Sequence, residues 1–222
     1  MDGSDADDPN TGGRAKETPI HDGAVADAAS SRESFIEPVV SAAVESVSTA
    51  AAAEVNGIPR ETRPDRLSSI LVAVGAGPHS GATVDIAREI AEATDAWLEL
   101  FHVVPSDDAL ADSSQTGDNT AGATGDHRTE TEYTAHGDRL LSAAKRRLGG
   151  FDRVDRWLVE DLTAAGAIVE QSPYYDLVVV GAPTTGTVGR FVFGSTTDTV
   201  VDDAAVPVIV VEAAGSTALC DV

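Results

Sequence analysis

Apolar and polar positions alternate along this chain in blocks that predict five strands separated by helices, starting near residue 67. Nearly continuous apolar runs that end at glycine, proline or charged residues are typical of strands covered on both faces. These runs lie at residues 69–74, 97–104, 155–159, 177–180 and 208–211. Between them, apolar residues repeat with helical period, as in the segment that begins at Ser80. Strands and helices that alternate in this way predict an α/β fold with a parallel sheet and helices on both faces.

The N-terminal part of the chain does not show this alternation. Residues 1–31 are acidic and polar without an apolar period, and we expect them to be disordered. Residues 32–66 are interpreted as an amphipathic helix over residues 34–55, followed by a linker. The apolar stripe of this helix has three candidate contacts, namely the domain, a second subunit or another protein. Packing on its own protein is favoured, because exposed apolar stripes are disfavoured.

One domain is expected over residues 67–214, with a short C-terminal tail at residues 215–222. Residues 105–128 interrupt the domain with a polar stretch rich in Asp, Ser, Thr and Gly. Such a long stretch without a predicted element is uncommon in a compact domain, so it is interpreted either as a surface loop or as a lid.

The charge of the chain excludes several classes of partner. Its formal net charge is −22, from 37 Asp and Glu residues against 15 Lys and Arg residues. Nucleic acids and anionic membrane surfaces would be repelled, and we expect neither as a partner. The charge either maintains solubility or indicates a cytoplasm of high salt, where the Debye length falls to about 3 Å near 1 M. The second interpretation favours a halophilic archaeal source.

Cysteine content and hydropathy predict a cytoplasmic protein. Cys220 is the only cysteine, so no disulfide forms within the chain, which fits a reducing compartment. No apolar run approaches the roughly 20 residues that a membrane helix needs. The acidic, polar N-terminus does not have the pattern of a signal peptide.

A glycine-rich segment between the last two predicted strands carries the strongest candidate chemistry. Glycine lets backbone N–H groups approach an anion closely, and a helix start adds unpaired N–H donors with a positive dipole. The segment predicts a phosphate cradle, and the alternative is an ordinary long loop. Arg190, its only cation, either neutralises a phosphate or lies in solvent. The candidate residues are Gly181, Thr184, Gly186, Gly189, Arg190, Gly194, Ser195, Thr196 and Thr197.

The spacing of these glycines resembles the ATP-binding signature of the universal stress protein (UspA) family. That signature is a glycine, two residues, a glycine, nine residues, a glycine, and then serine or threonine. Gly181 and Gly194-Ser195 fit it, whereas Thr184 takes the place of the middle glycine. The similarity extends over residues 67–212. It implies an open five-stranded parallel sheet in the order 3-2-1-4-5, as in adenine nucleotide alpha hydrolases, and it implies ATP or AMP as the cofactor, with or without Mg²⁺.

In the implied strand order, the sheet reverses its direction of growth between the first and fourth strands. Ligands in such sheets bind at the carboxyl ends of the strands that flank this point. These ends are Val74-Gly75 and Val180-Gly181, and Ala73 and Val103 complete the candidate cofactor-binding residues. In ATP-binding members of the family an Asp ends the first strand, and Gly75 takes its place here.

No set of side chains typical of catalysis is apparent. His79 lies near the first predicted turn without an evident partner, and His102 alternates with apolar residues, which favours a hydrogen-bonded core histidine over a base. The histidines lack metal-ligand spacing, and Ser195 lacks the Gly-x-Ser-x-Gly elbow. We therefore expect a nucleotide-binding regulator of the stress response rather than an enzyme, with weak ATP hydrolysis left open.

One alternative concerns function and one expectation concerns assembly. The absence of the family's Asp and middle glycine also fits an interaction module that binds no nucleotide and acts on an unknown protein partner through the N-terminal helix.

The apolar run from Val206 to Val211 would form an exposed edge strand. Because the resemblance implies dimerisation, we expect a homodimer to form through this edge.

Overall fold

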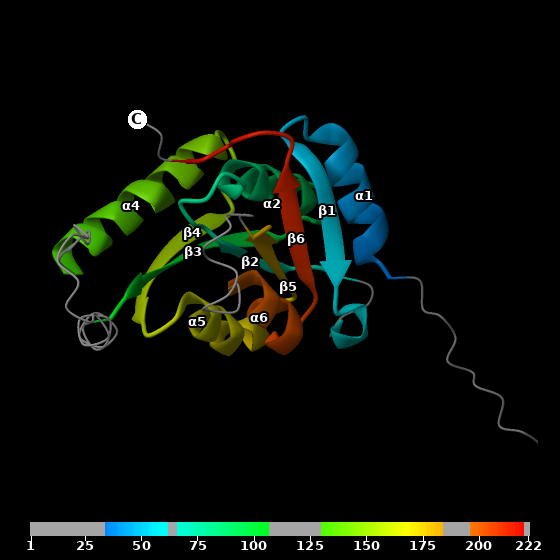
Figure 1. The fold of residues 1–222 in the computed structure, drawn as a ribbon. Coiled ribbons are helices and arrows are strands. Elements are labelled where there is room, and N and C mark those ends of the chain that lie inside the picture. Colours follow the sequence, from blue (N-terminus) through cyan, green and yellow to red (C-terminus); the bar gives the residue numbers. More distant parts are fainter. Residues whose placement is uncertain (1–33, 62–65, 107–129, 184–195, 220–222) are drawn as a thin grey trace, which may run out of the picture. The chain divides into compact units, whose positions relative to one another are not determined.

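The α/β architecture is present in a computed structural model that describes residues 34–61, 66–106, 130–183 and 196–219 (Figure 1). Its centre is a six-stranded sheet in the order β1-β6-β5-β2-β3-β4. The strands are β1 (Ala50–Asn56), β2 (Ser69–Ala73), β3 (Trp97–Pro105), β4 (Val154–Asp161), β5 (Leu177–Gly181) and β6 (Val208–Ala213). Strands β2 to β6 are parallel and have the order that the resemblance implied, whereas β1 is an additional, antiparallel strand.

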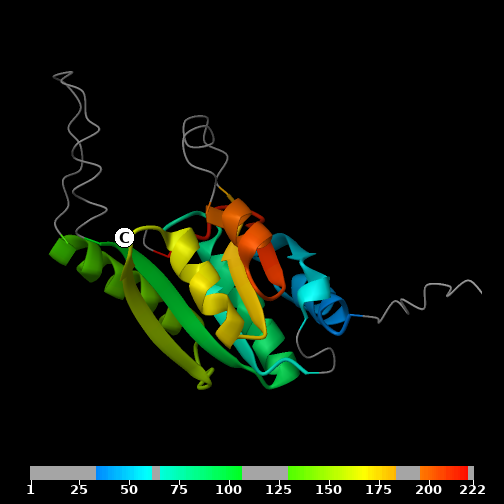
Figure 2. The same ribbon diagram turned by 90° about the horizontal axis from the view of Figure 1, so that it is seen from below.

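Helices cover both faces of this sheet (Figure 2). One face carries α1 (Ile36–Ser46), α2 (Ser80–Thr94) and α4 (Glu130–Arg147), and the other carries α5 (Ala164–Gln171) and α6 (Thr196–Asp203). Successive residues of a strand point to opposite faces, so Val72 of β2 packs in the first core and Leu71 in the second. Two short 3₁₀ helices, η1 (Ile58–Arg60) and η2 (Ser172–Tyr174), complete the described elements.

The N-terminal segment differs from the single helix that was predicted for residues 34–55. Helix α1 ends at Ser46, and the following residues form β1, which pairs antiparallel with β6. The register places Ala53 opposite Val211 and Val55 opposite Ile209. Alanine has high helix propensity, but pairing with a neighbouring strand overrides that weak preference here.

The pairing of β1 with β6 overturns the expectation that the run from Val206 to Val211 is an exposed edge. Strand β6 is paired on both sides, with β5 and with β1. The two edge strands of the sheet are therefore β1 and β4. The N-terminal strand β1 therefore covers the edge of β6 through which a homodimer was expected to form. While β1 stays paired, a second subunit cannot pair with β6.

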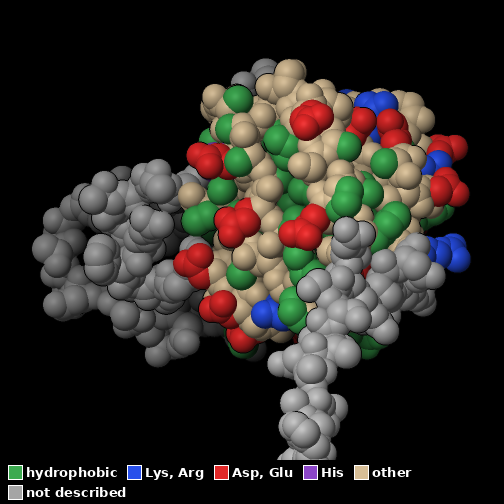
Figure 3. Space-filling view, turned by 90° about the vertical axis from the view of Figure 1, so that its right-hand side faces the viewer, with side chains coloured by type: hydrophobic (Ala, Val, Ile, Leu, Met, Phe, Trp, Pro, Cys, Tyr) green, Lys and Arg blue, Asp and Glu red, His purple; other side chains and the backbone are tan. Residues whose placement is uncertain are grey.

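Helix α1 packs its apolar stripe on its own protein, which is the interpretation that the sequence favoured. Ile36, Val40 and Ala43 are at most 3% exposed and belong to the core that α2 also contributes to. Figure 3 shows this side of the protein, where acidic side chains are interspersed with apolar ones. The three buried residues are therefore not available to another protein in this fold, whereas Val44 and Val47 of the same predicted stripe are half-buried.

The residues after β6 form a strap across the start of α2. The Thr217 carbonyl accepts the N–H of Gly81 (2.9 Å), and the Thr217 hydroxyl oxygen accepts the N–H of Ala82 (3.0 Å). The N–H of Thr217 donates in turn to the Pro78 carbonyl (2.7 Å). The strap thus satisfies two of the N–H groups that a helix start leaves without an intrahelical partner. A Cβ on Gly81 would lie 2.4 Å from the Thr217 carbonyl oxygen, so the close approach requires glycine.

Replacement of Gly81 by Ala is expected to displace the strap and to lower the free energy of unfolding by about 1–3 kcal/mol. The loss should occur although alanine is the better helix former, because the added methyl group collides with backbone. Urea unfolding followed by circular dichroism measures the change. The control is Gly150→Ala, since a Cβ at Gly150 meets nothing within 4 Å. Equal stability of the two variants would contradict the prediction.

Candidate functional site

A crevice of about 340 Å³ lies at the carboxyl ends of β2 and β5. The ladder between these strands ends at the pair Val72–Val179. Beyond that pair, the N–H of Val74 donates to the Phe101 carbonyl of β3 (2.8 Å), so β2 turns away from β5. The strand tips separate at the point where the sheet reverses its direction of growth, which is where α/β sheets bind ligands.

The structure brings together many of the residues that the sequence assigned to the site. Those that line the crevice are Ala73, Val74, Gly75, Val103, Val180, Gly181, Thr196 and Thr197. Thr184, Gly186, Gly189, Arg190, Gly194 and Ser195 lie outside the described residues. The glycine-rich segment therefore starts and ends at the crevice, while the role of its middle part stays a prediction.

Several lining residues were not assigned from the sequence. Helix α2 and the turn before it contribute His79, Ser80 and Thr83, and α5 contributes Ala164 and Ile168. The available signal was position, because His79, Ser80 and Thr83 follow the first predicted strand and its glycine turn. These residues form a second wall of the crevice, and no motif of the sequence marks them as ligand-binding.

His79 has a tautomer that the fold determines. Its Nδ1 atom accepts a hydrogen bond from the N–H of Ala213 at the end of β6 (3.0 Å). A neutral ring that accepts at Nδ1 carries its proton on Nε2. His79 therefore offers an N–H donor at Nε2. The His79 side chain also lies close to Gly181, because a Cβ added to Gly181 would lie 3.3 Å from the His79 Cβ.

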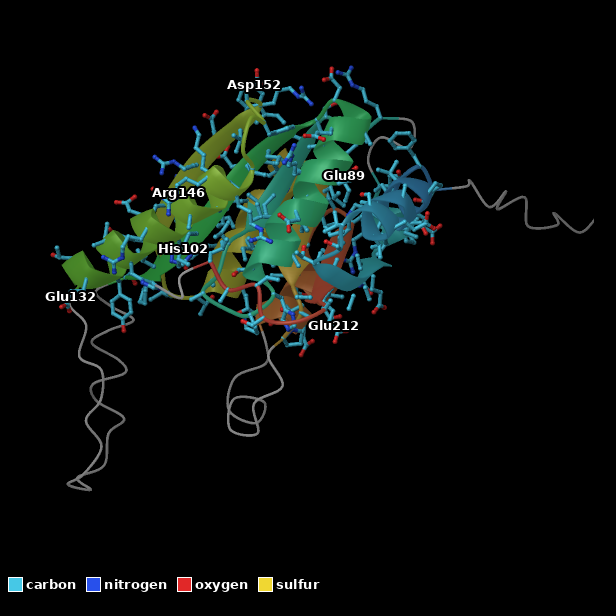
Figure 4. All side chains as sticks on the ribbon, turned by 90° about the horizontal axis from the view of Figure 1, so that it is seen from above. Glu89, His102, Glu132, Arg146, Asp152 and Glu212 are labelled. Carbon is cyan, nitrogen blue, oxygen red and sulfur yellow. The ribbon has the colours of Figure 1, made fainter. Side chains whose placement is uncertain are left out.

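His102 is held in the opposite way (Figure 4). Its Nδ1 atom lies 2.6 Å from the carbonyl oxygen of Val74, and because a carbonyl only accepts, Nδ1 donates. Burial lowers the pKa of His102, and nearby His136 lowers it further, against the opposing effect of the bond to Val74. His102 is thus a hydrogen-bonded histidine, which is the interpretation that the sequence favoured.

The described lining of the crevice contains no Asp, Glu, Lys or Arg side chain. The net charge of the chain is −22, so most anions near its surface are repelled. An anion bound in the crevice would contact no carboxylate among the described lining residues. Asp198, in the first turn of α6, lines a separate hollow with Glu54. The crevice is therefore better suited to an anionic ligand than the acidic surface around it.

Three of the hydroxyl groups in the crevice already donate hydrogen bonds within the protein. Ser80 donates to the Gly77 carbonyl (2.8 Å), Thr83 to the His79 carbonyl (2.9 Å) and Thr197 to the Gly181 carbonyl (3.0 Å). The Ser80 oxygen also accepts the N–H of Leu219 (3.2 Å), and all three oxygen atoms keep acceptor capacity for amino or hydroxyl groups of a ligand. This arrangement is suited to binding a polar ligand, and none of these three hydroxyls donates to a base as the hydroxyl of a nucleophilic serine or threonine does.

Two further findings concern the described residues only. Within these ranges, no three His, Cys, Asp or Glu side chains are placed together to hold a metal ion. None of the described helices is both long enough and apolar enough to cross a membrane.

The model of the universal stress protein family matches residues 67–212 of the chain. None of the curated proteins matches it. Among solved structures, a universal stress protein in complex with cAMP is 20% identical with a TM-score of 0.49, and the match covers 67% of this chain and 98% of that one. UspA from Lactobacillus plantarum is 24% identical with a TM-score of 0.49, over 66% and 99% of the two chains. A universal stress protein from Archaeoglobus fulgidus in complex with dAMP is 20% identical with a TM-score of 0.48, over 65% and 98%.

The lowered pKa of His102 predicts a pH-dependent loss of stability. An unfolded histidine, with a pKa near 6.5, takes up a proton at a higher pH than His102 does in the fold. The contribution of His102 to the free energy of unfolding is therefore full above about pH 6.5 and is lost as the pH falls below that value. Urea unfolding between about pH 7.5 and 5.5 should show a steeper loss in the wild type than in His102→Asn, whose amide can donate to Val74 without titrating. Parallel curves for the two proteins would refute this assignment.

Proposed function

Because this chain belongs to the universal stress protein family, we propose that it binds an adenine nucleotide in the crevice between β2 and β5. In this proposal it acts in the stress response as a regulator rather than as an enzyme. The observation that carries the proposal is that both ends of the glycine-rich segment line a crevice at the reversal point of the sheet, and that the described residues of its lining include no carboxylate.

The nucleoside part of the ligand is proposed to lie between β3, α2 and α5. Phe101, Val103 and Ile168 provide apolar surface for a base and a ribose. Ser80 and Thr83 provide acceptor oxygens for the amino group of the base or the ribose hydroxyls, because their own protons are used within the turn. An adenine nucleoside fits this combination of apolar walls and acceptors.

The phosphate part is proposed to lie at the glycine-rich segment and the start of α6. The start of α2 is not available to a phosphate, since Thr217 already occupies two of its N–H donors. Arg190 is the only Lys or Arg between Gly181 and Asp198, and in this proposal it neutralises the phosphate. ATP or AMP is the proposed ligand, and Mg²⁺ would enter with the phosphates of ATP, because the described lining offers no carboxylate to hold it.

Gly75 departs from the Asp that the family resemblance implies, but the fold has room for a side chain there. A Cβ on Gly75 would lie 4.0 Å from its nearest neighbour, the backbone nitrogen of Gly77. The missing carboxylate is thus a difference in sequence and not the consequence of a filled site. We propose that binding is weaker for this reason and is not abolished.

The charge of the chain extends the proposal to its environment. A net charge of −22 is screened in molar salt, and we propose a high-salt cytoplasm, as in halophilic archaea. Regulation without turnover requires a protein partner, which is not identified. A homodimer through β6 is not part of the proposal, because β1 occupies that edge.

Isothermal titration with adenosine, AMP and ATP in molar KCl tests the proposed site. Arg190→Ala is expected to weaken binding of AMP and ATP by about tenfold, because a charge-assisted hydrogen bond to phosphate is lost, and to leave adenosine binding unchanged. The control is Arg156→Ala, which changes the net charge equally on β4, where Arg156 donates to the Ser142 hydroxyl. No binding heat with any of the three ligands would reject the proposed function.

Gly75→Asp restores the carboxylate that the family resemblance implies. Because the position has room, the variant is expected to fold normally and to bind ATP several-fold more tightly than the wild type, by roughly 1 kcal/mol. The same titration measures the gain. Gly150→Asp adds the same charge at a position with no neighbouring heavy atom within 4 Å and should bind like the wild type. Binding by Gly75→Asp that equals binding by Gly150→Asp would place the nucleotide away from Gly75.

A further inference from the structure

Arg60 reaches from the end of the N-terminal segment to the last turn of α6. Its Nη1 atom donates to the carbonyls of Val201 (2.7 Å) and Ala204 (3.0 Å), and its Nη2 atom donates to the carbonyl of Asp202 (3.0 Å). These carbonyls belong to the helix end whose oxygen atoms have no intrahelical partner. A cation at this end also interacts favourably with the helix dipole.

The backbone before Arg60 is built to place it there. The last pair of the β1–β6 ladder, Asn56 with Val208, brings the chain beside the connection that leaves α6. Gly57 then adopts a φ of +72°, a conformation that favours glycine, and Pro59 continues into η1. The N–H of Arg60 donates to the Gly57 carbonyl (2.8 Å), and a Cβ on Gly57 would lie 3.2 Å from the Arg60 side chain.

Helix α6 depends on contacts outside itself. It has only 8 residues and one fully buried side chain, Val200. A helix of this length is not stable alone, so its position comes from tertiary contacts. The Thr197 hydroxyl holds its start to the Gly181 carbonyl (3.0 Å), and the N–H of Ala205 donates to the Ser172 hydroxyl (2.8 Å) just after its end. Arg60 adds three hydrogen bonds at that end, more than either of these side chains.

We infer that Arg60 is a positioning residue for the nucleotide site and acts through α6. By holding the C-terminal end of this short helix, Arg60 keeps Thr196 and Thr197 at the wall of the crevice. Arg60 lies outside residues 67–212, which the family model matches, so the N-terminal segment is a working part of the binding unit. The inference rests on the proposed function, because it concerns the affinity of the same crevice.

The test compares AMP affinity in Arg60→Ala, Arg60→Lys and the wild type by isothermal titration in molar KCl, below the unfolding transition of each protein. Arg60→Ala is expected to raise the Kd for AMP by about tenfold, because α6 loses the group that fixes its end. Arg60→Lys should show a smaller rise, since an ammonium keeps the charge without the planar fork. Hydrogen exchange should become faster in the amides of α6 and stay unchanged in β2 and β5 of Arg60→Ala.

The matched control is Arg153→Ala, which removes the same kind of contact from another helix. Arg153 donates to the carbonyls of Ala91 and Ala96 at the end of α2 (both 3.3 Å), but α2 has 15 residues, nine of them buried. Its loss should lower stability without changing the Kd for AMP.

Each outcome of this comparison decides the matter. Equal AMP affinity in the wild type and Arg60→Ala overturns this inference alone, and so does an equal loss of affinity in Arg153→Ala. No AMP binding by the wild type overturns the proposed function and this inference with it. If Arg60→Ala does not fold, Arg60→Lys and its exchange pattern in α6 decide.

Discussion

The pairing of β2 with β5 is the constraint from which the rest of the structure follows. Their paired residues, 70–72 and 177–179, have no measurable exposure, and the Asp176 carboxylate accepts the N–H groups of Ser68 (2.8 Å) and Ser69 (3.1 Å) where the pair begins. Strand β3 then adds on the far side of β2, and β6 adds on the far side of β5. The connections leave the two strand tips in opposite directions, and the space between the tips becomes the crevice.

Helices α2 and α6 both begin at this crevice, and their ends are held by different contacts. Thr217 saturates the start of α2, so that helix presents side chains such as Thr83 to the crevice and is not free to hold an anion by its backbone. Helix α6 is held at its start by the Thr197 hydroxyl and at its other end by Arg60, which donates to the carbonyl groups there. The same physical requirement, that helix ends need partners, is met by the C-terminal strap in one case and by the N-terminal segment in the other. The two segments that flank the family domain therefore act on opposite sides of one crevice.

The apolar runs predicted most of the fold, because a strand buried on both faces needs a continuous stretch of apolar residues, and few other elements contain one. The alanine-rich residues 50–56 could not be assigned in the same way. Alanine suits a helix locally, and only the open side of β6, far away in the sequence, makes a strand the better choice. Gly181, Thr196 and Thr197 followed from the glycine-rich segment, and the strand ends at the crevice followed from the implied strand order. Ser80 and Thr83 did not follow from either, since serine and threonine at a helix start are common for local reasons. The contacts of Arg60 and Thr217 are to backbone atoms more than 100 positions away, and a single sequence carries no pattern for such pairs.

Pairing β6 with a strand of the same chain, rather than with a second subunit, fits the charge of this chain. An apolar strand such as β6 needs a neighbour, and either a second subunit or a segment of the same chain can supply it. Two copies of this protein would each bring a net charge of −22 to the contact, and their repulsion would oppose association wherever salt does not screen it. A tethered strand meets no such barrier and loses no translational freedom on pairing. Its small residues, with Ala52 and Ala53 opposite Glu212 and Val211, cover the edge without bulky side chains. The N-terminal segment thus completes the sheet and, through Arg60, reaches the helix at the crevice, so that one intramolecular pairing serves both the stability of the fold and the geometry of the site.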